Sequence, residues 1–216
     1  DLKQLLKAIV LAFTQGQWQE PNARLGIAIC LGTMPILLAG MVIKLFGVDY
    51  ENSAFRSMPS IAIVSILMGL LLALAEKIGK RIKSLDNASG KEGLLIGFGQ
   101  MLALVPGTSR SGITLTTSLL NGWQRQDAAR FSLLLSIPTI IGAGVLKGFE
   151  LSTSANEILL YDVLTVTGLS FLFALVAISL LMVWLRRANF TPFVIYRVLL
   201  GGFLLSIVYV GHDWGF

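Results

Sequence analysis

Long apolar stretches, separated by short polar segments, make up most of this chain. Five of them are close to the roughly 20 residues that a helix needs to cross a bilayer. These stretches are Leu25–Phe46, Ser57–Lys77, Ala128–Phe149, Asp162–Leu185 and Phe193–Val210. The pattern predicts five transmembrane helices. Because the composition never changes to a soluble type, it predicts one integral membrane domain over residues 1–216.

The stretch 2–14 has a different pattern. Its apolar side chains recur at helical spacing, and Lys3 and Lys7 lie off that stripe. We expect an amphipathic helix there. It lies either at the membrane interface or at the cytoplasmic end of a preceding span.

A sixth apolar stretch, 93–122, is broken in its middle by Pro106-Gly107. Lys and Arg cluster on both sides of it, within 77–91 and 125–130, so both of its ends are expected on the cytoplasmic side. Its two arms would be about 20 and about 16 Å long, too short for a hydrocarbon core of about 30 Å. We therefore expect a re-entrant helical hairpin whose tip, Val105–Ser111, lies near the middle of the membrane.

Composition and charge agree with a membrane protein. Hydrophobic residues make up 55% and charged residues only 13% of the chain, whereas about a quarter of the residues in a soluble domain are charged. The net charge of +5 is explained by Lys and Arg on the cytoplasmic side, because basic and aromatic residues do not alternate on a polar face. The sequence therefore predicts no nucleic-acid partner. The segment 150–162 has acidic residues without Lys or Arg and is expected outside.

The tip of the hairpin carries the candidate chemistry. Arg110 is the one charged residue of the stretch 93–122, and no carboxylate between Glu92 and Asp127 can pair with it. An arginine at membrane depth is costly unless it faces a cavity or a ligand. We expect its partner to be an anion supplied from elsewhere.

Hydrogen-bond donors surround Arg110. The hydroxyl groups nearby belong to Thr108, Ser109, Ser111 and, one turn further on, Thr114. Gly107 permits the turn, and a helix that begins near Gly112 would direct free N–H groups toward the same space. These groups together match the oxygens of a phosphate. The alternative is a Pro-Gly helix break whose Ser and Thr satisfy the local backbone, with Arg110 bonded to carbonyl groups.

Two other pairs of polar residues allow two interpretations each. Glu76 and Lys77 end a predicted helix and are either interfacial anchors or part of a site. Tyr196 and Arg197 lie close to the start of the last helix. They either anchor that helix to lipid phosphate or support the site from a neighbouring helix.

Several ordered motifs carry a family resemblance. The run 104–114, LVPGTSRSGIT, resembles the Pro-Gly-x-Ser-Arg-Ser signature of the undecaprenyl-diphosphate phosphatases of the bacitracin-resistance type. The runs 129–138 (ARFSLLLSIP), 192–197 (PFVIYR) and 31–35 (LGTMP) resemble further motifs of that family. The resemblance covers nearly the whole chain.

This resemblance implies an all-α polytopic membrane enzyme built as an inverted repeat, each half with a re-entrant hairpin. Its activity would be removal of the terminal phosphate from undecaprenyl diphosphate, which recycles the carrier lipid for cell-wall synthesis. It also implies a divalent cation, Mg²⁺ or Ca²⁺, and the bacterial inner membrane as location. A homodimer stays open. The site residues carried over are Arg110, Ser109, Ser111 and Thr114 as catalytic, with Gly107, Thr108 and Arg110 as substrate-binding.

The chain also departs from the family pattern. Members carry an upstream Glu-rich motif and a Ser-Ser-Thr-Gly-His motif, and neither occurs here. Its single histidine, His212, lies outside any family motif and is expected to be an exposed terminal residue. We therefore expect no metal ligand in this chain, the ligands in an N-terminal segment that the chain lacks, and an inactive chain when taken alone. A lipid-phosphate or anion carrier without hydrolysis is the alternative function.

Overall fold

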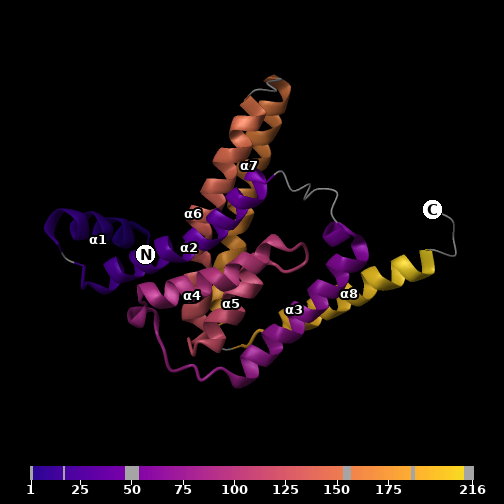
Figure 1. The fold of residues 1–216 in the computed structure, drawn as a ribbon, viewed down its shortest axis with the longest axis horizontal. Helices are drawn as coiled ribbons and strands as arrows, with labels where there is room; N and C mark the ends of the chain where they lie inside the picture. The colour runs from indigo at the N-terminus through magenta and orange to yellow at the C-terminus, as the bar shows by residue number, and fades with distance from the viewer. Residues whose placement is uncertain (1, 17, 47–53, 153–156, 186–187, 212–216) are drawn as a thin grey trace.

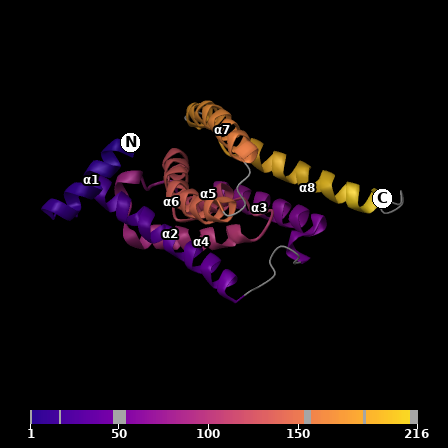
Figure 2. The same ribbon diagram turned by 90° about the horizontal axis from the view of Figure 1, so that it is seen from above.

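The computed structural model describes residues 2–16, 18–46, 54–152, 157–185 and 188–211, and these residues form a helical structure (Figures 1 and 2). The α-helices are α1 (Leu2–Gln15), α2 (Pro21–Leu45), α3 (Met58–Ile78), α4 (Gly90–Met101), α5 (Arg110–Leu120), α6 (Arg125–Ser152), α7 (Glu157–Trp184) and α8 (Thr191–Gly211). Short 3-10 helices lie at Ala54–Arg56, Leu85–Asn87 and Leu102–Leu104.

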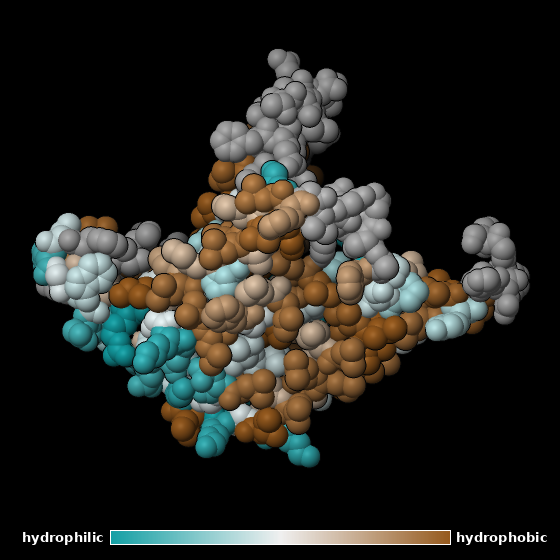
Figure 3. Space-filling view, in the orientation of Figure 1, coloured by the Kyte–Doolittle hydropathy of each residue, from teal (hydrophilic) through white to brown (hydrophobic). Residues whose placement is uncertain are grey.

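Five of the described helices, α2, α3, α6, α7 and α8, are long and apolar enough to cross a membrane. They coincide with the five predicted spans, and the prediction of an all-α, multi-pass membrane protein is confirmed. The outward faces of these helices are also apolar: Leu67, Leu70 and Leu74 of α3 are exposed, and Figure 3 shows brown apolar surface over most of the visible face. In a bilayer such a surface contacts lipid.

The helix predicted over 2–14 is present as α1. Leu5, Ala8 and Ala12 are buried at the spacing of a 3.6-residue period, whereas Val10, an apolar residue of the expected stripe, is exposed. The helix packs against α2.

The closest helix packing joins α2 to α4, which lie side by side in both ribbon views. A Cβ on Gly93 or Gly97 would collide with the backbone of Ala28 or Gly32 on α2. Gln100, fully buried, donates from Nε2 to the carbonyl oxygen of Gly32 at 3.3 Å. Small residues at this contact thus hold the first arm of the hairpin against a long helix.

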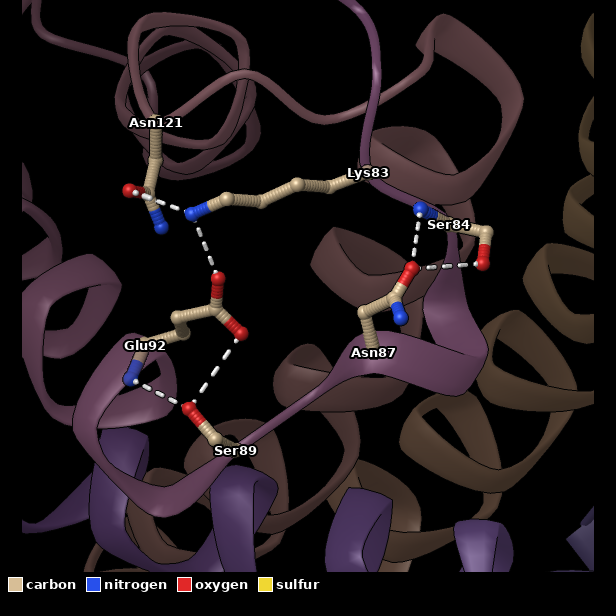
Figure 4. A network of polar contacts seen from close by, with 6 residues as sticks. All are labelled: Lys83, Ser84, Asn87, Ser89, Glu92 and Asn121. Atoms are coloured by element: carbon tan, nitrogen blue, oxygen red, sulfur yellow. Dashed lines mark hydrogen bonds and ion pairs between the residues drawn. The ribbon is translucent and has the colours of Figure 1, made fainter.

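The two arms of the hairpin, α4 and α5, are joined at their open end by Lys83. Its Nζ lies 2.7 Å from Oε1 of Glu92, at the start of α4, and 3.2 Å from Oδ1 of Asn121, just after α5 (Figure 4). The ends of 93–122 therefore lie close together, and the segment turns back on itself. That it does so within a bilayer remains a prediction.

Next to this open end of the hairpin, the buried carboxylate of Glu76 joins neighbouring segments of the chain. Glu76, only 9% exposed, forms ion pairs with Arg81 and Arg125, at the start of α6. Its carboxylate joins α3, the loop that follows it and α6, and the interpretation of Glu76 as an interfacial anchor stays a prediction. Glu76 does not line the cavity described below, so its contacts are structural.

Candidate functional site

The tip of the hairpin is a tight turn between the 3-10 helix Leu102–Leu104 and α5. Gly107 has φ +90°, and a Cβ at this position would lie 2.5 Å from the carbonyl oxygen of Ile61 on α3. Both the turn and the close approach of α3 thus require glycine here. The Pro-Gly break predicted from the sequence is the point where the chain reverses.

Ser109 begins α5 in a conformation that is rare for a residue with a side chain. Its φ is +63°, and its Oγ accepts a hydrogen bond from the N–H of Gly112 at 3.3 Å. The same Oγ lies 3.4 Å from Oγ of Ser111. Ser109 therefore caps α5, and this cap keeps two exposed hydroxyl groups together at the helix start.

A cavity of about 440 Å³ opens beside this turn. Its polar lining comes from the hydroxyls of Ser65, Ser109, Ser111, Ser132 and Tyr196, together with Arg197. The remaining lining residues are Ile61, Leu72, Gly107, Gly112, Leu115, Ala129, Leu133, Leu181, Phe190, Phe193, Leu200 and Leu204. Among these described residues there is no carboxylate. The cavity thus joins a polar, cationic end to long apolar walls.

Arg197 on α8 reaches the tip from a distant part of the sequence. Its Nη2 donates to the carbonyl oxygens of Gly107 and Thr108, at 2.5 and 2.7 Å. Of the two interpretations of this residue, the structure favours support of the site from a neighbouring helix. The local sequence pattern of α8 gave no partner for it.

Some of the candidate residues of the tip line the cavity, and the others do not. Gly107, Ser109 and Ser111 line the cavity. Arg110, the first residue of α5, is half-buried and is not among the lining residues, and its Nη1 has no hydrogen-bond partner in the described part of the chain. Thr108 is fully buried behind the turn.

Thr114 is also buried and does not line the cavity. Its Oγ1 is 3.0 Å from the carbonyl oxygen of Arg110 and 2.6 Å from Oγ of Ser132, which does line the cavity. Thr114 therefore couples the first residue of α5 to α6. Ser65 and Ser132 were missed from the sequence as lining residues, although Ser132 lies within the run 129–138 that carries part of the resemblance.

Comparison with known proteins identifies the family. The model of the family described as bacitracin resistance protein BacA matches residues 1–203. The chain belongs to this family. The matched range includes the hairpin, the cavity wall of α6 and Arg197, so the resemblance stated from the motifs is confirmed.

Curated relatives are similar over almost the whole chain. An undecaprenyl-diphosphatase of Prochlorococcus marinus (strain MIT 9303) is 54% identical over 210 residues, which cover 95% of this chain and 70% of the relative. An undecaprenyl-diphosphatase of Synechococcus sp. (strain RCC307) is 49% identical over 219 residues, which cover 100% of this chain and 75% of the relative.

The described residues do not form a site for a divalent cation. No group of three His, Cys, Asp or Glu side chains comes together among them. Mg²⁺ and Ca²⁺ require several oxygen ligands, usually carboxylates, and the described cavity wall has none. His212 lies outside the described residues.

Proposed function

We propose that this protein hydrolyses undecaprenyl diphosphate to the monophosphate and phosphate, with the diphosphate bound at the tip of the hairpin. The observation that carries the proposal is the family match together with about 50% identity to undecaprenyl-diphosphatases. The cavity supports it, because such a substrate has a compact anionic head and a long apolar chain. A polar end beside apolar walls fits both parts.

The start of α5 would bind the head group. Free N–H groups and the positive end of the helix dipole favour an anion there. Ser109 and Ser111 would donate their hydroxyls to phosphate oxygens, and Gly107 leaves the backbone open to them. These interactions strengthen as negative charge moves to the leaving phosphate oxygens, which is how a site accelerates phosphoryl transfer.

Arg110 would contribute the bidentate contact to the diphosphate. Its guanidinium is half-buried, and one nitrogen lacks a partner among the described residues. Burial of such a group is unfavourable until an anion pairs with it. We propose that the side chain turns toward the cavity when the diphosphate binds, while Thr114 and Thr108 hold the backbone on either side.

The reaction also needs a group that activates water, and the described cavity wall offers neither a carboxylate nor a histidine. A divalent cation is part of the proposal, with ligands other than these residues. The proposed location is the inner membrane of a bacterium, with the bilayer and the polyprenyl diphosphate as partners; the proposal needs no second copy of the chain.

Release of phosphate from undecaprenyl diphosphate tests the proposal. The assay compares the 216-residue chain with a chimaera that joins it to the part of the Prochlorococcus relative that the chain does not cover. Hydrolysis by the chimaera, with little or none by the chain alone, is expected. A chimaera that binds the substrate without releasing phosphate would favour the anion carrier, and efficient hydrolysis by the chain alone would show that the catalytic groups have been misplaced.

A further inference from the structure

Arg197 is placed to control the shape of the hairpin tip. It lies on α8, 90 residues from Gly107, and its two hydrogen bonds to the carbonyls of Gly107 and Thr108 fix both peptide groups that precede Ser109. Bonds from an arginine to carbonyl oxygens are charge-assisted and stronger than bonds between neutral groups.

Ser109 is the residue that needs such support. At φ +63° a residue with a Cβ is strained, and it remains there only when its surroundings hold it. The two carbonyls bound by Arg197 belong to the residues immediately before it. This conformation places the Ser109 hydroxyl over the N–H of Gly112 and beside Ser111 at the cavity wall.

The surrounding helices leave room for Arg197. A Cβ on Gly112 would lie 2.8 Å from its Nη1, and a Cβ on Gly69 of α3 would lie 3.2 Å from its Cβ. Two glycines from different helices thus accommodate the two ends of this side chain. Nη1 itself is buried and has no hydrogen-bond partner among the described residues.

We infer that Arg197 is a positioning residue: it holds the tip backbone so that Ser109 keeps the conformation that binds the diphosphate. The inference rests on the proposed function of the tip. A positioning role differs from direct neutralisation of the substrate charge, because Arg197 then acts through the backbone conformation of Ser109.

A double-mutant comparison separates these two roles. Arg197→Met keeps the length of the stem but removes the donors and the charge. It is combined with Ser109→Ala, which retains a Cβ and its strain, and with Ser109→Gly, which relaxes the strain. Both Ser109 variants lose the same hydroxyl, so they are matched controls.

Binding of radiolabelled undecaprenyl diphosphate to the purified chain is the first measurement. Arg197→Met is expected to weaken binding about tenfold or more in the Ser109→Ala background, and less than about threefold in the Ser109→Gly background, since glycine adopts positive φ without strain. Equal losses of binding in the two backgrounds would overturn the inference and favour a direct interaction between the Arg197 charge and the diphosphate.

Hydrogen exchange of the tip is the second measurement, and it needs no ligand. Peptides that cover 105–113 should exchange faster in Arg197→Met than in the wild type, because the N–H groups of Gly112 and Ile113 are bonded to Ser109. The start of α4, where the N–H of Gly93 is bonded to Ser89, should be unchanged. Unchanged exchange at the tip would overturn the inference, whereas a wild-type chain that binds no undecaprenyl diphosphate would count against the proposed function alone.

Discussion

Lys83 Nζ lies 2.7 Å from Glu92 Oε1, so the polar loop after α3 is fastened to the start of the hairpin. The same ammonium contacts Asn121 beyond α5, and the backbone of Lys83 accepts a hydrogen bond from the N–H of Gln124 at 2.9 Å. One residue thus joins both ends of the segment 93–122, and the hairpin is closed at its base.

Removal of this ammonium should loosen the hairpin base. Lys83→Met keeps the apolar stem and leaves Glu92 without its ion pair, which costs about 1 kcal/mol for a partly exposed pair. We expect a fall of a few degrees in the melting temperature of the detergent-solubilised protein. Lys91→Met, at an exposed position on α4, is the control, and an equal effect of both variants would argue against a specific role of Lys83.

Gly107 should be intolerant of any side chain. Gly107→Ala forces a Cβ into a residue with φ +90° and to within 2.5 Å of the Ile61 carbonyl oxygen. The tip must then separate from α3, so binding of undecaprenyl diphosphate should fall by about an order of magnitude or more. Gly202→Ala on α8 has open space around it and should bind normally. Normal binding by Gly107→Ala would show that the turn conformation is not needed.

The re-entrant course of the hairpin makes a prediction about sidedness. In a background in which Cys30 is replaced by Ser, single cysteines at Ser84 and Gln124 should both react with a membrane-impermeant maleimide from the cytoplasmic side. A cysteine at Ser154, in the segment expected outside, should react only from the other side. Labelling of Ser84 and Gln124 from opposite faces would mean that 93–122 crosses the membrane.

Much of this fold could be predicted because the signals are local. Continuous apolar runs define the five spans, and Pro106-Gly107 followed by Ser109 defines the turn and the cap of α5. Each of these features depends on residues a few positions apart. The helical period of α1 is likewise a local signal.

The rest depends on contacts between distant segments, which a local pattern does not contain. Glu76 pairs with Arg125, 49 positions later, and Arg197 binds carbonyls about 90 positions earlier. The arginine that lines the cavity beside Ser109 is thus Arg197. Arg110, the only charged residue of the stretch 93–122, follows Ser109 directly in the sequence but is half-buried and does not line the cavity. Which of two arginines faces a cavity follows from the helix crossings, and the motif alone does not give it.

Activity of Arg110→Lys in the chimaera tests the central claim most directly, since lysine keeps the charge but cannot form the bidentate contact to a diphosphate. Phosphate release from undecaprenyl diphosphate is measured alongside the melting temperature, which should stay within a few degrees of the wild type. The account predicts a fall in release of about tenfold or more in a folded protein. Near-normal release would contradict it and return Arg110 to a structural role.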